Sequence, residues 1–264
     1  MILSRVVARL REQQWAAVFI ELVIVVLGVF IGIQASNWNA AQADRRKGEQ
    51  FAARLLIDLR EDLVGRERMV AYYQAVEDSA RKVSALLGHV NSDPEALVVN
   101  AYRATEMNYY TLFRATWDEL VSSGEIAILP PYVDKDDVSR FFTFDVSKDT
   151  KDAFERSPYR QRVRRIIPQV VQDAIRAGCG DLMDEIGNVV AFKPECRVDL
   201  PPTQISAAAA ALASDPDVLP DLRLHFTTIN FALAGLSGDV VLLKRAIASF
   251  DARPDAPGSG AAKR

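Results

Sequence analysis

The segment from Trp15 to Ile33 constrains this chain more than any other feature. Its 19 residues carry one charge, Glu21, and are otherwise almost entirely apolar. A helix of that length rises about 28 Å at 1.5 Å per residue, which is close to the ~30 Å hydrocarbon core of a bilayer. Trp15 and Trp38 stand on either side of it, as aromatic residues do at the two membrane interfaces. We therefore expect a transmembrane helix over residues 15–36.

Two other interpretations of this segment stay open. One is a buried helix of a soluble core, although an apolar run this long rarely belongs to a helix with a polar face. The other is a cleaved signal peptide, because Arg5, Arg9 and Arg11 make a basic start and residues 41–43 (Ala-Gln-Ala) resemble a cleavage site. The long apolar stretch, the internal Glu21 and the distant cut favour a retained anchor.

The charges that flank the segment do not decide its orientation. Three arginines precede it, and Arg45, Arg46 and Lys47 follow it, so the positive-inside count is nearly a tie. A short N-terminal tail before a long domain is the usual arrangement of a signal anchor. We expect residues 1–14 in the cytoplasm and the bulk of the chain outside it.

Glu21, Gly28, Gly32 and Ser36 share one broad stripe of the predicted membrane helix. At 100° per residue, Glu21 and Gly28 differ by only about 20° of rotation. Small residues allow helix backbones to approach, and polar groups in the contact form hydrogen bonds. The stripe predicts a surface for helix association. The alternative is that Glu21, whose charge costs about 2.5 kcal/mol or more in hydrocarbon, reaches back to the interface and the glycines are incidental.

Two stretches of the chain resemble a known family. The run 20–39 contains a Glu, an apolar stretch, two glycines, a Gln, an Asn and a Trp-Asn pair; the run 116–126 contains Glu-Leu-Val-Ser-Ser-Gly. Both are similar to DUF6090, a bacterial family of unknown function. The resemblance covers the first ~60 residues well and 110–145 loosely. It implies a membrane anchor and carries no activity to this chain.

The rest of the chain predicts an all-α domain over residues 37–252. Apolar residues recur at steps of three, four or seven along 44–88, which indicates one long helix continuing from the anchor; parallel coiled-coil pairing is the alternative to packing inside one domain. Asp93 and Pro94 are typical of a helix start, and prolines break the segment 148–177. No strand is expected. The other helices are predicted near 94–108, 110–122, 134–144, 203–214 and 219–250, with a disordered tail over 253–264.

Cys179 and Cys196 are the only cysteines, and both fall in a predicted loop over 178–202. If the domain lies outside the cytoplasm, a disulfide between them closes that loop and contributes about 3 kcal/mol. No Cys-x-x-Cys motif or neighbouring His activates either thiol. Their spacing with the two histidines, His89 and His225, fits no zinc motif.

No motif for catalysis or phosphate binding occurs in the sequence. The net charge of −3 argues against nucleic-acid binding, and the basic residues at 156–165 are expected to form a balanced, exposed helix face rather than a lipid-headgroup site. We expect no cofactor, no metal and no enzymatic activity. The sequence favours a single-pass protein of the bacterial inner membrane whose extracytoplasmic helical bundle binds an envelope protein or a second copy of itself. A small-ligand sensor is the alternative, and an enzyme is the third possibility.

Overall fold

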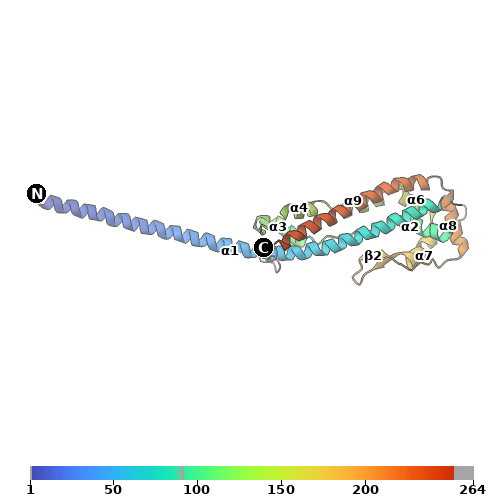
Figure 1. Ribbon diagram of the computed structural model, residues 1–264, viewed down its shortest axis with the longest axis horizontal. Helices are drawn as coiled ribbons and strands as arrows, with labels where there is room; N and C mark the ends of the chain where they lie inside the picture. The colour runs from blue at the N-terminus through green and yellow to red at the C-terminus, as the bar shows by residue number, and fades with distance from the viewer. Residues whose placement is uncertain (1, 88, 90–91, 253–264) are drawn as a thin grey trace, which may run out of the picture.

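The computed structural model describes residues 2–87, 89 and 92–252. The chain is mostly helical, as predicted, and its longest helix, α1, runs from Ile2 to Leu86. These 85 residues extend about 128 Å at 1.5 Å per residue. The helix passes without a break from the apolar N-terminal segment into the bundle (Figure 1), which confirms that one helix joins the two. The expected tail over 253–264 lies outside the described residues.

The N-terminal part of α1 projects alone from the bundle (Figure 1). Every side chain from Phe19 to Ala40 is exposed, and from Phe19 onward the first buried residue is Gly48. There the bundle begins, because a Cβ at Gly48 would lie 2.1 Å from the carbonyl oxygen of Ile128. Residues 37–47 therefore form an exposed helical spacer between the apolar segment and the packed domain.

The bundle is organised around α1 and the last helix, α9 (Val218–Asp251). α9 runs back toward the spacer, so the described chain ends beside the point where α1 enters the bundle (Figure 1). Leu55, Leu59 and Val76 of α1 and Leu236 and Leu243 of α9 are all fully buried. The apolar stripe of α1 is thus used for packing inside one domain.

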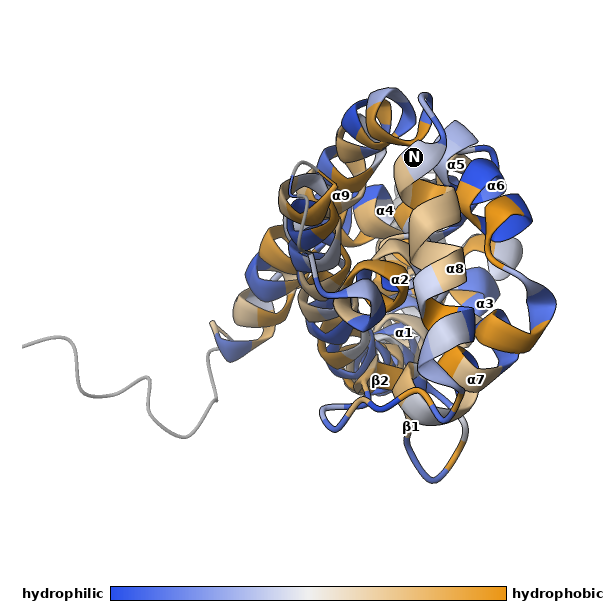
Figure 2. Cartoon of the chain, turned by 90° about the vertical axis from the view of Figure 1, so that its right-hand side faces the viewer, coloured by the Kyte–Doolittle hydropathy of each residue, from blue (hydrophilic) through white to orange (hydrophobic). Residues whose placement is uncertain are grey.

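Short helices complete the bundle around this pair. In Figure 2, which looks at the end remote from the apolar segment, α8 crosses the view, with α9 on one side and α6 and α7 on the other. Their bounds are α2 Pro94–Arg103, α3 Ala115–Ser123, the 3₁₀ helix η1 Glu125–Ile128, α4 Lys135–Thr143, α5 Val146–Glu155, α6 Pro158–Ile166, α7 Gln169–Cys179 and α8 Pro202–Ser214.

Residues 104–114 connect α2 to α3 without forming a helix, where the sequence predicted helix on both sides of Tyr109. The backbone N–H of Tyr110 donates to Ser147 Oγ and that of Phe113 to the Asp62 carboxylate. The Tyr110 ring lies directly against Gly65 of α1. Because these N–H groups find partners in side chains of α1 and α5, they do not pair within a helix.

The prediction of no strand was wrong for a small hairpin. β1 (Asp181–Met183) pairs antiparallel with β2 (Val189–Phe192), with Asp181 opposite Phe192. The turn between them holds Gly187 at φ 86°, and the Asp184 carboxylate accepts from the backbone N–H of Ile186 and Asn188. Strands of three and four residues are too short to show a clear alternation in sequence.

Two apolar clusters fill the bundle, one at each end. The cluster remote from the spacer is built from α1 beyond Met69, from α2 and α6–α8, and from α9 up to Leu236. The cluster near the spacer contains α1 from Phe51 to Leu59, α3, α4 and the end of α9 from Leu243. Between them lies a layer of charged residues, described below.

Leu59 and Ile57 provide a matched test of this packing. Leu59 is fully buried, whereas Ile57 is 62% exposed. We expect Leu59→Ala to lower the free energy of unfolding by about 2–5 kcal/mol, because it leaves a cavity between α1 and α9. Ile57→Ala should change it by less than about 0.5 kcal/mol. Urea unfolding in detergent measures both, and equal effects of the two substitutions would contradict the packing described.

Candidate functional site: the exposed helix, the charged layer and the clamped hairpin

Glu21, Gly28, Gly32 and Ser36 lie on the exposed part of α1. No atom outside the helix's own backbone lies within 4 Å of a Cβ built on Gly28 or Gly32. Among the described residues, therefore, no segment of this chain packs on the stripe. Its role in helix association stays a prediction.

Two helices of the described residues are long and apolar enough to cross a membrane. In α1 the apolar stretch lies within the part of the helix from Phe19 onward and is wholly exposed. In α9 part of the window is buried, and that helix also buries His225 and Asp239 against the bundle. The environment of α9 is that of a core helix, whereas no described part of the chain covers the apolar stretch of α1.

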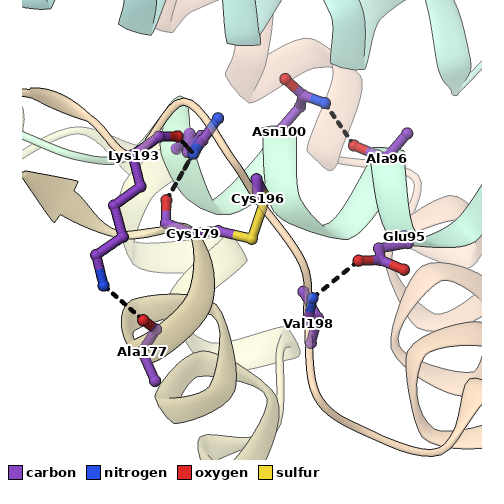
Figure 3. The surroundings of a disulfide bond; sticks show 9 residues. Glu95, Ala96, Asn100, Ala177, Cys179, Lys193, Cys196 and Val198 are labelled. Carbon is purple, nitrogen blue, oxygen red and sulfur yellow. Dashed lines mark hydrogen bonds between the residues drawn. A yellow bond between two sulfur atoms is a disulfide. The ribbon is translucent and has the colours of Figure 1, made fainter.

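The predicted disulfide joins Cys179 and Cys196, 17 residues apart (Figure 3). Cys179 is the last residue of α7, and Cys196 lies in the segment after β2. The hairpin is the loop that this bond closes. α7 also approaches this segment closely, because a Cβ at Gly178 would lie 2.0 Å from the carbonyl oxygen of Arg197.

Arg103, at the end of α2, binds the segment closed by the disulfide. Its guanidinium donates to the carbonyl oxygens of Cys179 and Lys193, at 2.8 and 2.9 Å (Figure 3), and lies over the ring of Phe192. On the other side of the hairpin, Tyr72 Oη donates to the Asp181 carboxylate at 3.0 Å. Burial, together with the charge of nearby Glu106, raises the pKa of Asp181 to about 6. The hairpin is thus held by α1, α2 and the disulfide together.

The charged layer consists of Asp62 and Arg66 on α1 and Asp239 on α9. Arg66 is fully buried and its Nε donates to Asp239 Oδ2 at 3.0 Å. Asp62 is also fully buried, and its Oδ2 has no hydrogen-bond partner among the described residues. Burial raises the pKa of both Asp62 and Asp239 to about 6, although Arg66 opposes the shift in each case.

The sequence places charged residues at inward positions of α1 and α9, but helical periodicity alone did not identify them as a layer. Asp62 and Arg66 occupy the inward positions between Leu59 and Met69, and Asp239 occupies the inward position between Leu236 and Leu243. Charged residues at such positions face either one another or solvent. The sequence alone does not reveal which, because the pairing of α1 with α9 joins residues 173 apart.

His225 and the basic residues of α6, which were candidates for a chemical role, have structural roles in the described part of the chain. His225 is buried between Ser157 Oγ and the carbonyl oxygen of Ala104, each 2.8 Å from a ring nitrogen, and burial lowers its pKa to about 4. Two basic residues of α6 form ion pairs: Arg162 contacts Asp215, Asp217 and Asp221, and Arg164 contacts Glu106. The acidic partners of Arg162 and Arg164 agree with the expected charge balance, but these two residues are half-buried, so the expectation of an exposed face was wrong for them.

A groove of about 540 Å³ opens between α1, the 109–113 connection and the hairpin turn. Val64, Gly65, Tyr110, Phe113 and Ile186 provide its apolar lining, and Arg68 and Asp184 form an ion pair at 3.4 Å at its edge. Within the described residues, no group of three or more His, Cys, Asp or Glu side chains is arranged to hold a metal ion.

Comparison with known proteins finds one family that resembles part of this chain. Residues 21–143 match DUF6090, a family of unknown function, as the sequence predicted. The matched region runs from Glu21 in the exposed helix to the last residue of α4. No curated protein and no solved structure matches this chain.

The disulfide should contribute measurably to stability. We expect the double variant Cys179→Ser/Cys196→Ser to lower the free energy of unfolding by about 3 kcal/mol, because the 17-residue loop is no longer closed in the unfolded chain. Reductant should lower the stability of the wild-type protein to the same level and leave the variant unchanged. Equal stability of variant and wild type in oxidising buffer would contradict this.

The charged layer predicts how stability depends on pH. The pKa of Asp62 rises from 3.8 to about 6 on folding. The contribution of Asp62 to the free energy of unfolding is therefore most favourable below pH 3.8 and is lost as pH rises through 6. Asp62→Asn keeps an oxygen for the Phe113 N–H and removes the charge. We expect the free energy of unfolding of Asp62→Asn to equal that of wild type near pH 4 and to exceed it at pH 7 by up to about 3 kcal/mol.

Urea unfolding at the two pH values measures the effect. Asp78→Asn, at an exposed position of the same helix, is the control and should show no such trend. A difference between Asp62→Asn and wild type that is constant from pH 4 to 7 would contradict the burial of an ionisable Asp62.

Proposed function

We propose that this chain is a single-pass protein of the bacterial inner membrane that carries a non-catalytic interaction or scaffolding bundle on the extracytoplasmic side. The observation that carries the proposal is the wholly exposed apolar stretch of α1, which projects from the domain and continues into its core. Burying such a stretch in hydrocarbon removes its apolar surface from water. Residues 15–36 would span the membrane, and residues 37–47 would separate the bundle from it.

The disulfide supports the extracytoplasmic side. Disulfides persist in oxidising compartments and are rare in the cytosol. The Cys179–Cys196 bond closes the loop that holds the hairpin, so the domain would need an oxidising compartment to reach the structure described. The short segment before residue 15 would stay in the cytoplasm.

The interaction role is supported by where exposed apolar side chains gather. Besides the anchor, Ile57, Val64, Phe113 and Ile186 are exposed on the bundle. Large exposed apolar groups that lie together mark interaction surfaces. The groove beside the hairpin is the feature that favours the second candidate, a small-ligand sensor.

Glu21 provides a test of the interaction role. We expect chemical crosslinking in intact membranes to trap a homodimer or a complex with an envelope protein. We expect Glu21→Leu to reduce the yield of this crosslinked product, because the stripe of the membrane helix loses its polar contact. Phe30→Leu, on the opposite side of the same helix, is the matched control and should leave the yield unchanged.

Alkaline extraction of the membranes tests the anchor separately. The wild-type chain should stay in the membrane fraction. Release into the soluble fraction would contradict the anchor, whereas a retained chain that never crosslinks would contradict the interaction role. If Glu21→Leu leaves the crosslinking yield unchanged, Glu21 lies at the membrane interface and not in a contact between helices.

A further inference from the structure

The bundle leaves one apolar face of α1 without cover. Ile57 is 62% exposed and Val64 is 44% exposed, one on each side of Glu61 along the outer surface of the helix. Phe113 and Ile186, which are 50% and 85% exposed, line the groove beside Val64. In Figure 1, α1 forms the lower edge of the bundle near the spacer, whereas β2 and α7 lie below it at the remote end. We call Ile57, Val64, Phe113 and Ile186 the outer patch.

The outer patch lies on the same side of α1 as the stripe in the exposed N-terminal segment. Ile57 follows Glu21 by 36 residues, and Val64 follows Gly28 by 36 residues. Because α1 is unbroken and an α-helix has 3.6 residues per turn, 36 residues make about ten full turns. Glu21 and Gly28 are therefore followed at nearly the same angle, about 54 Å further along the axis, by Ile57 and Val64.

We propose that the outer patch is a homodimer surface, on which a second copy of this chain binds parallel to the first, with both α1 helices facing each other from Glu21 to Val64. The proposal rests on the membrane anchoring proposed above. The bilayer gives all copies the same direction and the same height. A second copy is thus the partner that presents the same stripe and the same patch at matching positions.

The charges beside the patch favour this parallel arrangement. Relative to Val64, Arg60 lies about 40° to one side of the stripe and Glu61 about 60° to the other. Both side chains are exposed, and neither forms an ion pair within the described part of the chain. A two-fold axis along the stripe brings Arg60 of one copy toward Glu61 of the other, on both flanks of the contact. Such flanking pairs set the direction and register of paired helices.

Cysteine crosslinking tests the surface directly. Ile57→Cys adds one thiol to a chain whose own cysteines are paired, and the exposed position leaves the fold intact. We expect oxidation of membranes that contain the full-length variant to give a disulfide-linked dimer. Phe231→Cys, which is 54% exposed on α9, is the matched control and should give at least fivefold less dimer.

The outcomes separate this inference from the function on which it rests. A chain that stays in the membrane under alkaline extraction but gives no more dimer with Ile57→Cys than with Phe231→Cys overturns the homodimer surface and leaves the anchor standing. A chain that is released from the membrane overturns both.

Insertions in the spacer test whether the two halves of the stripe act as one face. Two alanines placed after Ala40 turn the bundle by about 200° relative to the membrane segment, whereas seven turn it by about −20°. In the Ile57→Cys chain we expect the two-residue insertion to reduce the dimer at least fivefold and the seven-residue insertion to restore it. An equal yield from both insertions would overturn the shared face.

Discussion

The packing of α1 against α9 is the contact on which the rest of the structure depends. Both helices run the length of the bundle, and α2 and α3 pack on α1 while α4, α5 and α6 pack on α9. The buried Arg66–Asp239 pair lies within this contact, between the two apolar clusters. A buried charge is strongly destabilised when its partner is absent. The pair therefore opposes any shift of α1 along α9 that would separate the two charges.

The same helix that forms the core also leaves it. α1 carries Leu55 and Leu59 into the bundle and carries the exposed apolar segment away from it, with no turn between them. A rotation or tilt of the N-terminal segment is thus transmitted to the bundle through one continuous hydrogen-bonded rod. Because α1 is continuous, the angular positions of its residues about the helix axis can be compared over its whole length. On this basis the stripe at Glu21 and Gly28 is linked with the outer patch.

Helical periodicity and local signals predicted much of this architecture. The long helix from the apolar segment, the start of α2 after Asp93, the break at Ser157–Pro158 and the Cys179–Cys196 disulfide all follow from nearby residues. The non-helical connection 104–114 could not be predicted this way, because the groups that accept from its N–H groups, on Asp62 and Ser147, are remote in sequence. The charged layer and the position of the groove depend likewise on which helices become neighbours.

The side of the membrane on which the bundle lies is the most direct test of this account. Intact spheroplasts would be treated with a membrane-impermeant maleimide, with and without an impermeant reductant, and the labelling of half-buried Cys196 measured. The chain with Phe231→Cys, labelled without reductant, reports access to the bundle. The account predicts that the native cysteines are labelled only after reduction and without opening the membrane. Thiols that react without reductant, and only once the membrane is broken, would place the bundle in the cytoplasm and contradict it.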